Sequence, residues 1–189
     1  MSLDGKTIAL LVAPRGTEEP EFTKPKAALE QANATVVVIG LESGEAQLVN
    51  NDLDPGQTVS VDKTIDQVSA REFDGLVIPG GSVGADKLRA SHPVIRFVHD
   101  FFQQEKPVGV ICHGPWLLVE ADVVDGRTLT SFPTVRTDIE NAGGNWVDEE
   151  VVTDQGLVTS RNPDDLPAFC AKIVEEFAEG RHADQSVSA

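Results

Sequence analysis

Short apolar runs alternate with longer amphipathic stretches along this chain. Continuous apolar runs, rich in β-branched residues, predict buried strands at residues 7–13, 35–39, 76–78 and 108–111. Apolar residues at helical spacing predict helices over residues 23–32 and 93–102, and a last helix after residues 163–165. Continuous apolar strands that alternate with helices are typical of parallel sheets covered on both faces. We therefore expect an α/β fold: a flavodoxin-like, doubly wound, mostly parallel sheet sandwiched by helices.

The pattern changes in the last third of the chain. Shorter strands are predicted at residues 128–131, 146–147, 151–153 and 157–160. Residues 180–189 are polar and lack periodicity, which predicts a frayed tail. No linker or repeat separates the predicted elements, so we expect a single domain over residues 1–179 and a polar C-terminal tail over residues 180–189.

Composition and charge exclude several classes of partner. The 189 residues include 15 Lys and Arg against 31 Asp and Glu, a formal net charge of −16. Such a negative field repels nucleic acid and anionic lipid, so neither is an expected partner. The apolar runs are too short to span a membrane, the N-terminus lacks a secretory signal pattern, and only two cysteines occur. These features favour a reducing, cytoplasmic location.

Cofactor and metal motifs are not found in the sequence. It contains no HExxH or CxxC motif, and no His/Cys pair at metal-ligand spacing. A P-loop and a GxGxxG fingerprint are also lacking. We therefore expect neither a metal nor a nucleotide cofactor.

The strongest chemical signal is the segment that follows the fourth predicted strand, Cys112-His113-Gly114-Pro115. Ligands of open parallel sheets bind at the carboxyl ends of the strands. A cysteine on a strand-to-helix elbow points into that cleft, and the helix N-terminus behind it is expected to lower the pKa of its thiol. The backbone N–H groups of His113 and Gly81 would form an oxyanion hole.

Two other residues bear on the thiol chemistry. Glu21 stands among three acidic residues within four positions, and these either form a solvated loop or place one carboxyl in the cleft. In the second case, crowding and burial would raise the pKa of Glu21, which could then share a proton with Cys112. Cys170 lies on the apolar stripe of the last predicted helix and is expected to be a structural thiol.

The motif Gly109-Val-Ile-Cys112-His113-Gly114-Pro115 resembles the signature of PfpI-type intracellular proteases. That family belongs to the class I glutamine amidotransferase-like superfamily, together with the parkinsonism-associated deglycases. The resemblance extends in consistent order over roughly residues 5–178 and includes Glu18-Glu-Pro-Glu21, Leu76-Val-Ile-Pro-Gly-Gly81, Asp86-Lys-Leu-Arg89 and Val158-Thr-Ser-Arg161.

The resemblance implies roles for individual residues. Cys112 matches the family nucleophile, Glu21 the acid that contacts it, and His113 the base of the protease-like branch. Asp86 matches the carboxylate that completes a triad across a subunit interface in that branch. Arg161 matches an arginine that can bind an anionic substrate group. The deglycase branch instead uses a later histidine, where this sequence has Phe132.

Three functions remain open from the sequence. We favour a stress-response enzyme that acts on reactive carbonyls by glyoxalase or deglycase chemistry, with small aldehydes or glycated molecules as substrates. A histidine adjacent to its nucleophile is expected to point away from it, which disfavours the alternative, an intracellular cysteine peptidase acting on peptides. The third hypothesis is a redox-sensing or chaperone-like stress protein. A homodimer or higher homo-oligomer is expected.

Overall fold

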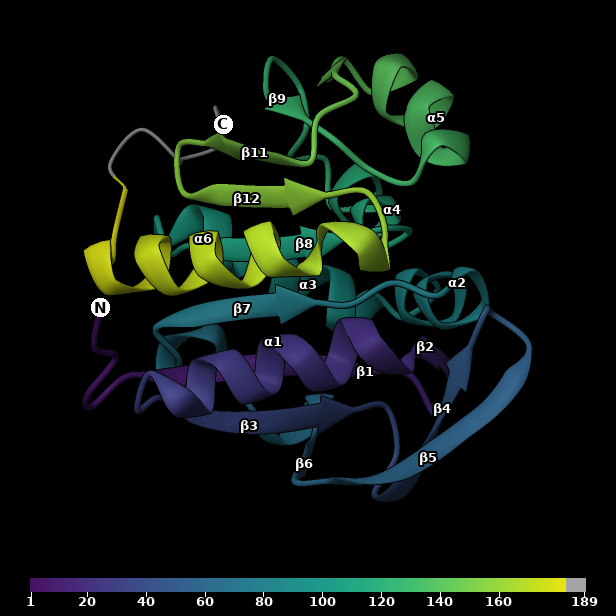
Figure 1. The fold of residues 1–189 in the computed structure, drawn as a ribbon, viewed down its shortest axis with the longest axis vertical. Coiled ribbons are helices and arrows are strands. Elements are labelled where there is room, and N and C mark those ends of the chain that lie inside the picture. The colour runs from purple at the N-terminus through teal and green to yellow at the C-terminus, as the bar shows by residue number, and fades with distance from the viewer. Residues whose placement is uncertain (183–189) are drawn as a thin grey trace.

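The computed structural model describes residues 1–182 (Figure 1). Within this range, a central sheet has the strand order β11-β12-β8-β7-β1-β3-β6. Every neighbouring pair is parallel except β11 and β12. Its strands are β1 (Thr7–Val12), β3 (Thr35–Gly40), β6 (Lys63–Thr64), β7 (Gly75–Ile78), β8 (Val108–Ile111), β11 (Val151–Asp154) and β12 (Leu157–Ser160). The predicted mostly parallel α/β fold is confirmed.

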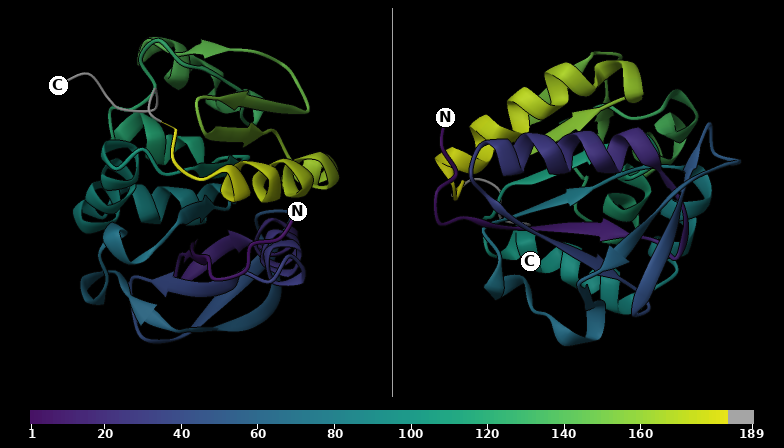
Figure 2. Two further views of the ribbon diagram at one scale, coloured as in Figure 1. Left: turned by 90° about the vertical axis from the view of Figure 1, so that its left-hand side faces the viewer. Right: turned by 60° about the horizontal axis from the view of Figure 1, so that its bottom comes forward.

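Helices cover both faces of this sheet (Figure 2). The N- and C-terminal helices lie side by side on one face, and three helices from the middle of the chain cover the other. The first pair is α1 (Glu19–Gln31) and α6 (Leu166–Glu179); the second layer contains α2 (Ser82–Arg89), α3 (His92–Gln103) and α4 (Pro115–Glu120).

The core is divided by the side-chain alternation of the central strands. In β1, Ile8 and Leu10 pack with α1 and α6, whereas Ala9 and Leu11 face the other helical layer. Buried phenylalanines fill both layers, including Phe101 on α3. Because both faces of β1 are buried, its sequence is continuously apolar, which is why the pattern predicted it.

The polar strands of the second sheet, β2 (Arg15–Glu18), β4 (Gly44–Asn50) and β5 (Asp54–Val61), were not predicted. Many β5 side chains are exposed, so the strand has a polar sequence that resembles that of a loop. Two short strands, β9 (Thr128–Leu129) and β10 (Asn145–Trp146), pair beside α5 (Arg136–Asn141) and fall at strands predicted over residues 128–131 and 146–147.

The first helix starts earlier than the predicted range, residues 23–32. Helix α1 begins at Glu19, with Pro20 in its first turn and Pro25 in its interior. A proline in the first turn favours this early start. It lacks a backbone N–H, but an N–H at that position would have no intrahelical partner. As a result, Glu21 lies on a helix rather than in the predicted loop, and the helix fixes its direction.

The chain after α6 folds back onto the domain. The backbone N–H of His182 donates to the carbonyl of Glu105 at 2.9 Å. Residues 180–182 of the predicted tail are therefore docked, and residues 183–189 lie outside the described part. Within residues 1–182, none of the helices has the length and apolar character needed to cross a membrane.

Candidate functional site

Cys112 occupies a tight elbow between β8 and α4. Its φ angle is +63°, a left-handed conformation that a non-glycine residue adopts only at a cost of about 1–2 kcal/mol. Two backbone hydrogen bonds hold this geometry: the Cys112 N–H donates to Ser160 O at 3.0 Å, and the Phe132 N–H donates to Cys112 O at 2.8 Å. The elbow places the sulfur at the carboxyl end of the central strands, with only 6% of the residue exposed.

His113 points toward the sulfur, which corrects the expectation that it would point away. Its Nδ1 lies 3.2 Å from Cys112 Sγ, and its Nε2 lies 3.4 Å from Thr134 Oγ1. The imidazole is stacked on Phe132 and flanked by Trp116, with ring centroids 4.7 and 5.1 Å away. Burial lowers the pKa of His113, although the charge of Asp52 opposes this shift. The neutral imidazole can therefore accept the thiol proton at Nδ1.

Glu21 is buried beside the thiol. Its residue is 0% exposed, its Oε2 accepts the Gly80 N–H at 2.8 Å, and its carboxyl hydrogen-bonds with Cys112. Burial raises the pKa of Glu21 to about 8, against the opposing effect of the hydrogen bonds from Cys112 and Gly80. The nearby charges of Glu18 and Asp52 raise this pKa further. The carboxyl thus holds a proton at neutral pH. This agrees with the hypothesis that Glu21 lies in the cleft and shares a proton with Cys112, and not with a solvated loop.

The predicted lowering of the Cys112 pKa is wrong for the free site. Burial, followed by the negative charge of Glu21, raises the pKa of this thiol above its ordinary value. The backbone N–H groups of Gly81 and His113 both hydrogen-bond to the sulfur and act in the opposite direction. These are the two groups predicted to form the oxyanion hole, and they converge on the reactive atom. Activation of the thiol therefore depends on transfer of its proton within the site.

The position of the Gly81 N–H depends on a glycine. Gly81 has a φ of +87°, and a Cβ at this residue would lie 2.2 Å from Gly16 O. We expect Gly81→Ala to destabilise the protein by about 2 kcal/mol or more and to displace the N–H from the sulfur. Chemical denaturation measures the first effect. Gly126→Ala is the matched control, because Gly126 has a φ of +73° with open space around its Cβ. Equal losses in the two variants would contradict the steric argument.

Among residues 1–182, no hydrogen bond or ion pair joins Asp86 or Arg161 to Cys112. Asp86 is exposed on α2, and no hydrogen bond among residues 1–182 joins it to His113. The Arg161 guanidinium is held by both oxygens of Asp165 at 2.9 Å and by Asp148 at 2.7 Å. Asp165 binds Arg161 and makes no side-chain hydrogen bond to the N-terminus of α6. The proposed roles of Asp86 and Arg161 remain predictions.

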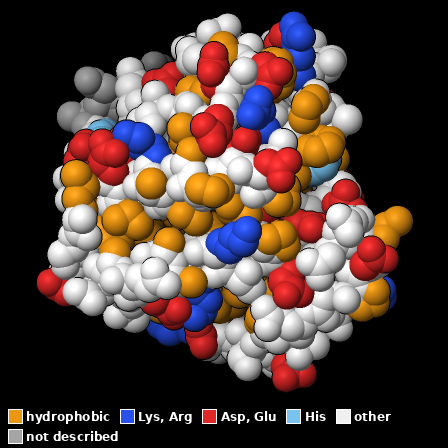
Figure 3. All heavy atoms as spheres, viewed as in Figure 1, with side chains coloured by type: hydrophobic (Ala, Val, Ile, Leu, Met, Phe, Trp, Pro, Cys, Tyr) orange, Lys and Arg blue, Asp and Glu red, His pale blue; other side chains and the backbone are white. Residues whose placement is uncertain are grey.

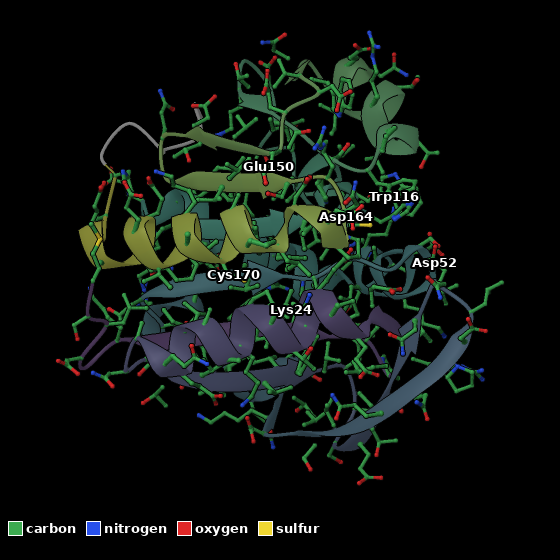
Figure 4. All side chains as sticks on the ribbon, in the orientation of Figure 1. Lys24, Asp52, Trp116, Glu150, Asp164 and Cys170 are labelled. Atoms are coloured by element: carbon green, nitrogen blue, oxygen red, sulfur yellow. The ribbon has the colours of Figure 1, made fainter. Side chains whose placement is uncertain are left out.

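Cys170 differs from Cys112 in its surroundings. It lies on α6, facing α1, and burial raises the pKa of its thiol to about 11 (Figure 4). The nearby charge of Lys24, on α1, acts in the opposite direction. This environment keeps the thiol protonated at neutral pH, so it agrees with the predicted structural role.

Sequence reasoning missed the turn between β4 and β5. The Glu18 carboxylate accepts the N–H groups of Asn51 and Asp52 at 2.9 and 3.1 Å, and Asp52 accepts the Ser82 N–H at 2.7 Å. Figure 4 shows Asp52 and Trp116 on the side of the molecule toward which β7 and β8 point. This turn therefore ties β2 and α2 together beside the site. Its isolated polar residues carry no motif that would have identified it.

The chain resembles known proteins over most of its length. It is 43% identical to YraA of Bacillus subtilis (strain 168), which is named as a candidate cysteine protease, over 87% of this chain and 94% of YraA. Protein/nucleic acid deglycase 2 of Escherichia coli (strain K12) is also 43% identical, over 87% of this chain and 93% of the relative. General stress protein 18 of Bacillus subtilis (strain 168) gives the same identity over 87% and 94% of the two chains.

Solved structures and family models agree with these relatives. The crystal structure of Drosophila melanogaster DJ-1beta superposes with a TM-score of 0.82 at 32% identity, covering 94% of this chain and 91% of that one. The model of the DJ-1/PfpI family matches residues 6–176. The predicted resemblance is confirmed, and the chain belongs to the DJ-1/PfpI family.

Proposed function

We propose that this protein is a stress-protective enzyme that converts 2-oxoaldehydes such as methylglyoxal into 2-hydroxy acids, with Cys112 as nucleophile. The observation that carries the proposal is the placement of a neutral base and a protonated acid on one sulfur. His113 Nδ1 lies 3.2 Å from Sγ, and the buried Glu21 carboxyl hydrogen-bonds with the same thiol. Proton transfer over such distances is efficient general acid–base catalysis.

The first step is addition of the thiol to the aldehyde. His113 Nδ1 takes the Cys112 proton as the sulfur bonds to the aldehyde carbon and the C=O π electrons move to oxygen. The N–H groups of Gly81 and His113, which hydrogen-bond to the sulfur in the free site, would then stabilise that oxygen. Returning the proton to the oxygen gives a neutral hemithioacetal.

The second step moves a proton between adjacent carbons. His113 removes the hydrogen of the former aldehyde carbon, and the protonated Glu21 carboxyl donates its proton to the neighbouring carbon. The hydroxyl proton of the hemithioacetal passes to the ketone oxygen, and His113 then returns the proton it took to Glu21. The ketone thereby becomes an alcohol, and the former aldehyde carbon becomes a thioester carbonyl. Water then hydrolyses this thioester, which releases the 2-hydroxy acid and the Cys112 thiol. The net reaction adds one water to the oxoaldehyde, and no external oxidant or reductant is needed.

Deglycation of early carbonyl adducts would use the same attack on a carbon that still carries an amine, guanidine or thiol of another molecule. The name of the Escherichia coli relative, a protein/nucleic acid deglycase, supports that extension. We keep it as a second substrate class for the same residues.

A cysteine peptidase is the second candidate, and one observation favours it. His113 is close enough to Cys112 to serve as the base of a Cys–His pair, so the orientation argument against it does not hold. Two features still favour small aldehydes: only 6% of Cys112 is exposed, and the His113 ring is enclosed by Phe132 and Trp116. A triad would also require Asp86 from a second chain.

We propose a homodimer or larger homo-oligomer as the working assembly. Figure 3 shows hydrophobic side chains gathered over α6 and α1. They include the partly buried residues Cys170, Val174 and Ala178 of α6. The exposed Asp86 on α2 would be available to a neighbouring chain only if α2 also meets that chain.

Product analysis distinguishes the two enzymatic candidates. We expect purified protein to convert methylglyoxal into lactate without glutathione, and to leave casein and fluorogenic peptides uncleaved. Lactate is measured by a coupled lactate dehydrogenase assay, with heat-denatured protein as the blank. Peptide cleavage without lactate formation would reverse the ranking of the two candidates.

A further inference from the structure

A second cluster of titratable side chains lies at the C-terminal end of α6, where acidic side chains gather in Figure 3. Glu176 and Glu179 are three residues apart, so they lie on neighbouring positions of one helix face. Gly180, with a φ of +91°, then reverses the chain and brings His182 back against Glu176. The hydrogen bond from the His182 N–H to Glu105 O fixes the returning segment.

At this cluster the Glu176 side chain is buried, and so is the Nε2 atom of His182, whose side chain is 20% exposed. The Glu176 side chain is only 8% exposed, and its carboxylate accepts no hydrogen bond from the described residues. Its contact is His182 Nε2 at 3.4 Å, an atom that is itself buried and without a hydrogen bond. Lys172, whose charge acts on Glu176, is engaged by Glu175 at 2.8 Å. A buried carboxylate in this state is costly unless it is paired or coordinates a metal.

The spacing of the ligand atoms fits a divalent cation. Zinc bonds of about 2.0–2.1 Å at a tetrahedral angle place two ligand atoms roughly 3.3–3.4 Å apart. The Glu176 Oε2 to His182 Nε2 separation is 3.4 Å, and one ligand atom from each of Glu176, Glu179 and His182 lies within 4.8 Å of the others. Glu179 is exposed, so rotation of its side chain can shorten its distances.

We propose that Glu176, Glu179 and His182 bind one Zn²⁺ ion, with water at the fourth position. One imidazole and two carboxylates suit zinc and similar borderline divalent cations. The ion would clip the docked residues 180–182 to α6. The site lies at the opposite end of α6 from the Cys112 elbow, so it stabilises the fold and takes no part in the thiol chemistry. Linear motifs missed it because the reversal at Gly180 supplies the third ligand.

Isothermal titration with Zn²⁺ tests the proposal. The protein should be tag-free and carry Cys112→Ser, because the catalytic thiol is itself a zinc ligand. We expect one equivalent of Zn²⁺ to bind. Since loss of even an outer-shell partner weakens metal binding about 10- to 100-fold, His182→Ala should weaken it at least about tenfold. The matched control, His92→Ala, removes an exposed histidine of α3 and should leave the affinity unchanged.

Two further measurements protect the test against misfolding. Glu179→Gln changes an exposed side chain and should also weaken binding, and Co²⁺ should give the absorption of a four-coordinate site without a thiolate charge-transfer band. Zn²⁺ should raise the melting temperature of the parent protein but not that of His182→Ala. Binding of equal affinity in the parent and His182→Ala, or no Zn²⁺ binding by the parent, would overturn the assignment.

Discussion

Cys112→Ser should lower lactate formation from methylglyoxal by at least about a thousandfold, because loss of a nucleophile typically removes most of an enzyme's rate enhancement. Serine preserves the elbow and its backbone hydrogen bonds, but its hydroxyl is a far weaker acid than a thiol. The neutral His113 and the protonated Glu21 are arranged around a sulfur and cannot ionise that hydroxyl to a comparable extent. The measurement is the rate of lactate formation at saturating and at low substrate concentration.

The second cysteine supplies the matched control. Cys170→Ser removes a thiol whose pKa burial raises to about 11 and that lies on the apolar side of α6. This variant should keep the parent activity, and circular dichroism should show both variants folded. If activity survived in Cys112→Ser and was lost in Cys170→Ser, the nucleophile would be Cys170, and the proposed mechanism would be wrong.

The Cys112 elbow could be predicted from sequence because its determinants are local. A buried apolar strand, β8, ends at the cysteine, and Gly114 and Pro115 begin the next helix. The orientation of His113 could not be predicted in the same way. Alternation of side chains assumes an extended chain, whereas the φ of +63° at Cys112 turns the following residue back toward the sulfur.

The same limit applies to the acidic segment that begins α1. Glu18, Glu19 and Glu21 have the same side chain and differ only in direction. Glu18 accepts two N–H groups of the β4–β5 turn, Glu19 accepts the Gln57 N–H at 2.7 Å, and Glu21 faces the thiol. The partners of Glu18 and Glu19 come from β5 and the β4–β5 turn, whose polar sequences gave no strand signal. The sequence alone therefore left both interpretations of Glu21 open, and tertiary packing decides between them.

Glu21→Gln should remove a pH dependence of stability that the parent protein has. The Glu21 pKa is about 8 in the folded state, against 4.5 for an unperturbed glutamate. Below pH 4.5 the carboxyl is protonated in both states and its burial is not penalised. As the pH rises from there to about 8, only the unfolded state ionises, so the free energy of unfolding falls by roughly 1.4 kcal/mol per pH unit from this residue. Glutamine stays neutral, keeps an acceptor for the Gly80 N–H, and has no such slope.

Urea denaturation between pH 5 and pH 8 measures this difference, in a Cys112→Ser background so that thiol ionisation does not contribute. The stability advantage of Glu21→Gln over its parent should grow as the pH rises. Glu42→Gln is the control, because Glu42 is exposed and should give a difference that does not change with pH. If the stability difference between Glu21→Gln and its parent did not change with pH, Glu21 would have an ordinary pKa. It would then be ionised at neutral pH and could not supply the proton that the proposed chemistry assigns to it.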